Sequence, residues 1–125
     1  MAVRILMVDD SQLVKDIVKL RLESLGYQVS LASSGEEALD AIHESPPDLI
    51  VLDIRMPGID GYEVCRRLRQ DPSPAVRDLP IIALTSMDDT QVGFEAGVDD
   101  YLNKDFDLLD LGDRISFLLR MRGVQ

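Results

Sequence analysis

Five side chains in this sequence have the types and positions needed for chemistry on a phosphoryl group. Asp9 and Asp10 follow an apolar run near the N-terminus, and Asp53, Thr85 and Lys104 each follow a later run. If these runs are parallel strands, their carboxyl ends meet at one edge of a sheet, where such sheets bind ligands. The sequence therefore predicts that the five side chains lie together.

The three carboxylates predict a site for a divalent cation. Carboxylates that converge on one edge repel one another unless a bound cation offsets their charge. Mg2+ suits such a partial set of ligands, because it commonly binds one or two carboxylates together with water and a phosphate oxygen. The cation and Lys104 would neutralise the phosphoryl oxygens, Thr85 would donate a hydrogen bond, and Asp53 would attack in line.

Each of these residues also has an ordinary structural explanation when it is taken singly. An acidic pair after a strand is often a turn or a helix cap, Thr85 could be a strand-end hydroxyl, and Lys104 a solvated charge. Only the placement of all five residues at the same end of successive runs favours a functional site.

The elements that must position these residues alternate along the chain. Short, continuous apolar runs indicate strands covered on both faces, and they lie at 3–8, 29–32, 49–52, 81–84 and, more weakly, 100–103. Segments with helical spacing lie between them, and helix starts are readable at Ser34 and Asp60, each with a Glu three residues later. This alternation predicts an α/β fold with a doubly wound, five-stranded parallel sheet and helices on both faces.

Composition limits the class of protein. The 125 residues correspond to one domain over 1–125, without a separate output domain. Lys and Arg number 13 against 23 Asp and Glu, and the net charge of −10 disfavours direct binding to nucleic acid or to an anionic membrane. Cys65 has no second cysteine to pair with, and no apolar run reaches the roughly 18 residues of a membrane span, so we expect a cytoplasmic protein.

Four segments together resemble the receiver domain of two-component response regulators, the CheY-like superfamily. They are ILMVDDS at 5–11, DLIVLDIRMPGIDG at 48–61, PIIALT at 80–85 and GVDDYLNK at 97–104. The resemblance covers essentially the whole chain. It implies a flavodoxin-like sheet with strand order 2-1-3-4-5, and a signalling domain that catalyses only its own phosphoryl gain and loss.

The resemblance also implies a role for each site residue. Asp53 accepts a phosphoryl group from a sensor kinase phosphohistidine, directly or through a phosphotransfer protein. Asp10, Asp53 and the carbonyl of Arg55 contact Mg2+, and Asp9 acts through water on the ion. Thr85 and Lys104 hold phosphate oxygens. As Thr85 moves, Tyr101 turns inward and changes the surface formed by the last strand and the helices on either side of it, which is a shift between two states.

Two departures from the family pattern give further predictions. Lys104 is followed by Asp105 rather than Pro, and a cis bond to a non-proline residue costs about 2.5–4 kcal/mol, so we predict a trans bond. The stretch from Thr85 to Lys104 is about three residues shorter than is usual in the family, and it contains Gly93, so we predict a short fourth helix.

Three other functions compete with a phosphorylated receiver. A phosphorylation-independent pseudo-receiver that only binds proteins stays open because of Asp105 and the short fourth helix. An Mg-dependent aspartyl phosphatase would need an Asp-x-Asp segment after the first strand, where this chain has Asp9-Asp10-Ser11. A flavin-binding module would need a phosphate-binding loop, which the Asp9-Asp10 pair would repel. The kinase, the output and the oligomeric state are not readable from the sequence.

Overall fold

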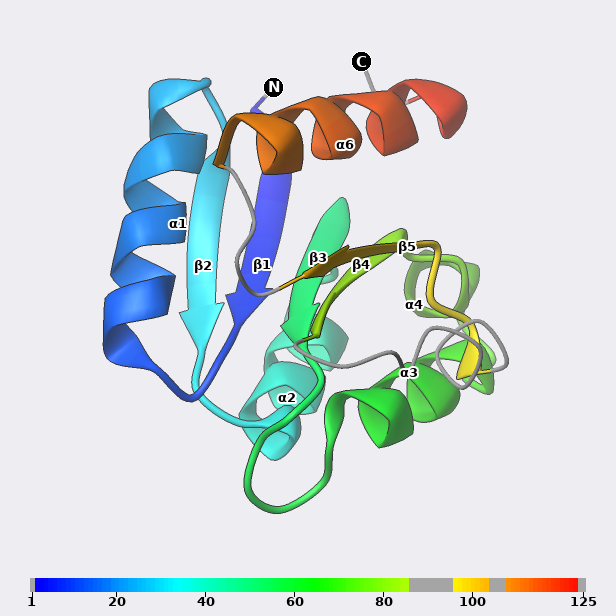
Figure 1. Ribbon diagram of the computed structural model, residues 1–125. Helices are drawn as coiled ribbons and strands as arrows, with labels where there is room; N and C mark the ends of the chain where they lie inside the picture. The colour runs from blue at the N-terminus through cyan, green and yellow to red at the C-terminus, as the bar shows by residue number, and fades with distance from the viewer. Residues whose placement is uncertain (1, 86–95, 104–107, 124–125) are drawn as a thin grey trace.

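The computed structural model describes residues 2–85, 96–103 and 108–123. Within them lies one parallel sheet with neighbours in the order β2-β1-β3-β4-β5, which confirms the predicted fold class and strand order (Figure 1). The strands are β1 (Arg4–Val8), β2 (Gln28–Ala32), β3 (Leu49–Asp53), β4 (Ile81–Thr85) and β5 (Asp100–Asn103).

The two central strands show why this sequence forms a covered sheet. Every residue of β3 and of β4 is buried, as expected for Val-, Ile- and Leu-rich strands packed on both faces. β2 lies at an edge of the sheet and alternates between exposed and less exposed positions. Both Asp53 and Thr85 are the last residues of their strands, and the backbone that carries them is therefore fixed by the sheet.

Helices cover the two faces of the sheet. They are α1 (Gln12–Ser24), α2 (Gly35–Glu44), α3 (Gly61–Arg69), α4 (Pro74–Arg77) and α6 (Leu108–Met121). Val18 of α1 and Ile115 of α6 share one hydrophobic cluster, whereas Ile42 of α2 and Val64 of α3 belong to the other. The predicted doubly wound arrangement is thus confirmed, with two cores separated by the sheet.

Local signals in the sequence set the helix boundaries. The Ser34 hydroxyl accepts the N–H of Glu37 at 3.1 Å, and the Asp60 carboxylate accepts that of Glu63 at 2.9 Å, so both predicted helix starts are confirmed. Gly26 follows α1 with a φ of 95°, a left-handed conformation that favours glycine.

The structure adds one element and leaves two predictions without a test. The single-turn helix α4 was not predicted, and it begins with Pro74 at its first turn. The predicted fourth helix between Thr85 and Lys104 is a different segment, and residues 86–95 lie outside the described part of the chain. The Lys104–Asp105 peptide bond also lies outside it.

Candidate functional site

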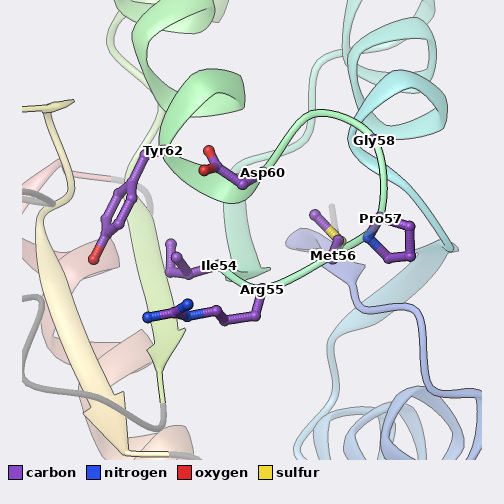
Figure 2. Close-up of a pocket in the computed structure, with 7 residues that line it drawn as sticks. All are labelled: Ile54, Arg55, Met56, Pro57, Gly58, Asp60 and Tyr62. Atoms are coloured by element: carbon purple, nitrogen blue, oxygen red, sulfur yellow. The ribbon is translucent and has the colours of Figure 1, made fainter.

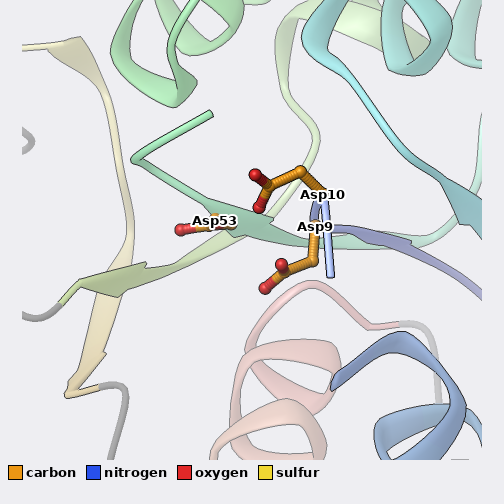
Figure 3. Close-up of side chains that lie close together, drawn as sticks. All are labelled: Asp9, Asp10 and Asp53. Atoms are coloured by element: carbon orange, nitrogen blue, oxygen red, sulfur yellow. The ribbon is translucent and has the colours of Figure 1, made fainter. Parts of the chain in front are cut away.

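The three predicted carboxylates converge at the carboxyl end of the sheet. Asp9 follows β1 directly and Asp53 ends β3, and these strands are neighbours, with Val8 aligned to Leu52. One carboxylate oxygen from each of Asp9, Asp10 and Asp53 lies within 4.8 Å of the others. Figure 3 shows the three side chains gathered at the strand ends. The sequence prediction that these residues meet is therefore confirmed.

Turns immediately after the strands hold two of the carboxylates in place. Asp9 accepts the backbone N–H of Ser11 at 2.8 Å, and Asp53 accepts that of Arg55 at 3.2 Å. Each aspartate thus bonds the backbone two residues ahead and turns the chain away from the sheet. Both side chains are fully buried, whereas Asp10 is exposed.

This donor set fits a hard divalent cation. Three ionised carboxylates at this separation repel one another, and a cation between them relieves that repulsion. Oxygen ligands are those that Mg2+ prefers, and the exposed Asp10 leaves the group open on one side for water and a phosphate oxygen. The carbonyl of Arg55 is two residues beyond Asp53, at the start of the same turn.

The other predicted site residues lie on the neighbouring strands β4 and β5. Thr85 is buried at the end of β4 and is aligned with Asn103 of β5. Tyr101 is half-buried, is aligned with Ala83, and packs against the core on the α2 and α3 side of the sheet. Successive side chains of a strand point to opposite faces of the sheet, so Thr85 points to the same face as Ala83, two residues earlier. Thr85 and Tyr101 therefore lie on the same face. Lys104 falls just beyond the described strand, and its predicted place stays a prediction.

A shallow cavity of about 560 Å³ lies beside the acidic group, and no pattern in the sequence predicted it. It is lined by the loop between β3 and α3 and by the start of α3, namely Ile54, Arg55, Met56, Pro57, Gly58, Asp60 and Tyr62. In Figure 2 the Arg55 and Tyr62 side chains extend to the same side of this loop. The cavity offers a guanidinium and a phenol next to the strand that ends in Asp53.

Gly61 fixes how closely α3 approaches this strand. A Cβ at this position would lie 2.7 Å from the Asp53 carbonyl oxygen and 2.8 Å from the Ile54 Cα. Only glycine fits such a close approach to backbone. The Asp60-Gly61 pair was recognised in the sequence as a helix start, but its role in seating α3 against the site depends on three-dimensional packing.

Cys65 lies on α3 and is buried in the core between this helix and the sheet. Its Sγ donates to the Ala96 carbonyl at 3.2 Å, and burial raises the pKa of the thiol to about 11. A thiol with so high a pKa is protonated and unreactive near neutral pH.

The sequence of residues 5–116 matches the family model described as the response regulator receiver domain. The chain belongs to this family, and it is therefore a signalling domain of two-component systems and not an enzyme of the usual kind. The resemblance seen in the four sequence segments is confirmed.

Particular relatives agree with this assignment. The chain is 47% identical to the response regulator MprA of Mycolicibacterium vanbaalenii, over 96% of this chain and 52% of that protein. It is 43% identical to the probable transcriptional regulator ycf27 of Guillardia theta, over 94% of this chain and 45% of that protein. The chain thus spans about half the length of the curated relatives it matches.

Solved structures show the same fold. A putative response regulator from Chloroflexus aurantiacus has a TM-score of 0.89 and 41% identity, and the match covers 96% of this chain and 99% of that one. Chemotaxis protein CheY4 of Vibrio cholerae has a TM-score of 0.86 and 28% identity, with 93% and 98% covered. Among the described helices of this chain, none has the length and apolar character to cross a membrane.

Proposed function

We propose that this chain is a phosphorylation-activated switch in which Asp53 accepts a phosphoryl group from the phosphohistidine of a sensor kinase or phosphotransfer protein. The observation that carries the proposal is the position of the Asp53 carboxylate, at the end of a central strand and within 4.8 Å of Asp9 and Asp10. In the receiver family this arrangement is the one that phosphoryl transfer needs, because the nucleophile and the cation ligands must share one edge.

In the proposed transfer, an oxygen of Asp53 forms a bond to phosphorus while the bond between phosphorus and the kinase imidazole nitrogen breaks. The imidazole leaves with the electron pair of that bond and takes a proton from solvent. Asp9, Asp10, Asp53 and the Arg55 carbonyl would hold Mg2+, which when bound neutralises charge on the phosphoryl oxygens. Thr85 would donate to one phosphoryl oxygen and Lys104 would pair with another.

The response to phosphorylation would run along β4 and β5. Thr85 and Tyr101 face the same side of the sheet, and Tyr101 packs on the core there. A hydrogen bond from Thr85 to the phosphoryl group would move its hydroxyl and open space for Tyr101 to turn inward. Moving a two-state equilibrium from 1:99 to 99:1 requires about 5.5 kcal/mol of differential stabilisation, which two or three charge-assisted bonds supply.

The first turns of α1 offer a surface for the phosphoryl donor. Leu13, Ile17 and Leu20 have 68%, 44% and 74% of their surface exposed, and they follow one another along one side of the helix. The helix begins two residues after Asp10, so this apolar stripe starts beside the acidic site. A kinase that packs an apolar helix face on the stripe would bring its phosphohistidine near Asp53.

The output would lie in a separate domain, because the curated relatives are about twice as long as this chain and one is described as a probable transcriptional regulator. In such a protein the receiver does not itself contact DNA, as its net charge of −10 predicts. The phosphoryl group would be lost by hydrolysis within the same site, which limits the duration of the signal.

Intact mass spectrometry tests the proposal. The protein is incubated with Mg2+ and a small acyl phosphate or phosphoramidate, as wild type, Asp53→Asn and Asp16→Asn. Asp16 is an exposed carboxylate on α1 and serves as the matched control. We expect one added phosphoryl group on the wild type and on Asp16→Asn, and none on Asp53→Asn.

The absence of an adduct on the wild type would contradict the proposal if calorimetry shows that Mg2+ binds. That outcome would favour the pseudo-receiver, which binds partners without phosphorylation. An adduct on Asp53→Asn would place the acceptor at another residue.

A further inference from the structure

Lys15 is a buried cation for which the proposed reaction has no use. Among the described residues, the buried polar or charged ones are Asp9, Asp53, Thr85 and Lys15. The first three were predicted as site residues, whereas Lys15 was not. Only 2% of its surface is exposed. Lysine is almost never buried to this degree unless it is paired, because an ammonium loses its hydration there.

The hydrogen-bond partner of Lys15 does not neutralise its charge. The Nζ donates to the Oγ of Ser33, which is an uncharged hydroxyl. The ion pairs of the described part of the chain include other basic residues but not Lys15. A buried charge without a close counter-ion acts over longer distances, because the protein interior screens it less than water does.

A short series of hydrogen bonds links Lys15 to the acidic group. The Lys15 N–H donates to the Ser11 carbonyl at 3.1 Å, and the Ser11 N–H donates to the Asp9 carboxylate at 2.8 Å. On the other side, Ser33 follows Ala32, whose carbonyl accepts the Asp9 N–H at 3.1 Å. Asp9 therefore has hydrogen bonds to both segments that contact Lys15, namely Ser11, which accepts the Lys15 backbone N–H, and the end of β2, next to the Ser33 that accepts from Nζ.

Lys15 and Asp9 also share a face of the sheet. Asp9 is two residues beyond Met7, which belongs to the core cluster that α1 and α6 cover. Figure 3 shows the Asp9 carboxylate on the side where the ribbons of α6, in pink, and α1, in blue, are drawn. The Lys15 ammonium, held at Ser33, is thus on the α1 side of the acidic group.

We propose that Lys15 is a fixed counter-charge of the acidic site, which offsets the repulsion among its carboxylates and weakens their affinity for divalent cations. This inference rests on the proposed cation site. An ammonium on the α1 side of the carboxylates attracts them when no cation is bound, and it repels a cation that enters. The site would then exchange its cation readily instead of holding it permanently.

Isothermal titration calorimetry with MgCl2 tests the proposal, and it suits this chain because the sequence contains no Trp whose fluorescence could report binding. Lys15→Met removes the charge and keeps a similar length and apolar stem. We expect this variant to bind Mg2+ about 3- to 10-fold more tightly than the wild type, the size of effect of one unit charge across a partly polar interior. Lys15→Arg keeps the charge and should bind like the wild type.

Two control variants separate the charge of Lys15 from its packing. Lys19→Met removes a partly exposed charge from the same helix, and Ser33→Ala removes the hydrogen bond while the ammonium stays. Both should bind Mg2+ within about twofold of the wild type, because solvent screens the charge of Lys19 and because Ser33→Ala keeps the charge of Lys15. Lys15→Gln is a second neutral variant in case Lys15→Met does not fold.

The sign of the change decides the question. If Lys15 only holds α1 in place, its loss would leave Mg2+ binding unchanged or make it weaker, and that result would overturn the inference. If the wild type itself does not bind Mg2+, the proposed cation site is wrong and the inference falls with it. Asp10→Asn should bind Mg2+ much more weakly, which assigns the measured heat to this site.

Discussion

The aspartates at the two ends of the sheet have opposite electrostatic surroundings. At the carboxyl end, Asp9, Asp10 and Asp53 have oxygens within 4.8 Å of one another. At the amino end, Asp99 just before β5 is paired with Arg69 at 3.0 Å and with Arg122 at 3.1 Å, and it also accepts the N–H of Ile81 at 2.8 Å. Aspartate is thus paired with arginines at the amino end, whereas three aspartate carboxylates lie close to one another at the carboxyl end.

Arg69 connects several segments at the amino end of the sheet through hydrogen bonds. Its guanidinium donates to the carbonyls of Gly97, Arg77 and Leu79 at 2.7–3.0 Å, in addition to Asp99. These bonds join the end of α3 to α4, to the start of β4 and to the segment before β5. Charge at the amino end is therefore paired within the fold, whereas the three carboxylates at the carboxyl end form the proposed cation site.

The largest effect should come from Arg69→Met, which breaks the amino-end network. We expect the free energy of unfolding to fall by about 2–4 kcal/mol, because three carbonyls and one side of Asp99 lose a charge-assisted partner in a partly buried place. Urea denaturation measures this loss. Arg67→Met is the matched control on the same helix, since its ion pair with Glu63 is exposed and contributes at most about 1 kcal/mol. Equal losses in the two variants would contradict the comparison.

A smaller change of opposite sign is expected at the carboxyl end. Asp53→Asn should raise the free energy of unfolding by about 1 kcal/mol in EDTA, because it removes one of three repelling charges and keeps an oxygen for the Arg55 N–H. Adding Mg2+ should stabilise the wild type and leave the variant almost unchanged.

Asp99→Asn provides the counterpart of this experiment at the amino end, where the same substitution should destabilise the fold. A loss of stability in both aspartate variants would show that the carboxyl-end charges are not repulsive in the folded chain.

Another aspartate, Asp71, makes one ion pair, and this pair with His43 lies at the surface. The ring of His43 donates from Nδ1 to the Leu39 carbonyl at 2.8 Å and from Nε2 to Asp71 at 2.7 Å, so both nitrogens carry a proton in this geometry. The bond with Asp71, followed by that with Leu39, raises the pKa of His43 above its usual 6.5. The Ser73 N–H, followed by His43, lowers the pKa of Asp71.

The smallest effect should therefore be a pH-dependent one. A raised histidine pKa stabilises the fold below the unfolded pKa, and this contribution is lost as pH rises through the folded pKa. The lowered pKa of Asp71 adds stability above its unfolded value, which is lost in acid. The wild type should thus exceed His43→Gln in stability most clearly just below the usual histidine pKa of 6.5, and the two should converge as pH rises through the raised pKa of His43.

Urea midpoints at several pH values measure this difference. His43 is the single histidine of the chain, so the convergence can be assigned to it. A difference that stays constant with pH would mean that packing of the ring, and not its charge, stabilises α2 against the turn after α3.

The parts of the fold that the sequence predicted are those with the strongest local signals. β3 and β4 are apolar nearly throughout and buried at every position, and the capped starts of α2 and α3 each have a Glu in place. α4 was missed because a four-residue helix after Pro72 has no periodicity to detect and resembles a loop. Arg69 donates to the Arg77 carbonyl at the end of this turn and to the Gly97 carbonyl 28 residues away, and a local sequence pattern does not reveal such contacts.

The candidate site was predictable for a similar reason. Asp9 and Asp53 stand at strand ends, and parallel topology alone brings them together. Lys15 was not predictable, because it lies between Val14 and Asp16 on a helix whose lysines and acids look solvated. Its burial depends on β2 placing Ser33 beside it, which no local pattern reveals.

The strand order has a consequence for the protein as it is synthesised. β1 pairs with β2 on one side and with β3 on the other, and all three strands end by residue 53. The strands that bring Asp9, Asp10 and Asp53 together therefore leave the ribosome before β4 and β5. The later strands then add at one edge in the order of translation. The three acids can meet on the nascent chain before Thr85 and Tyr101 have been synthesised.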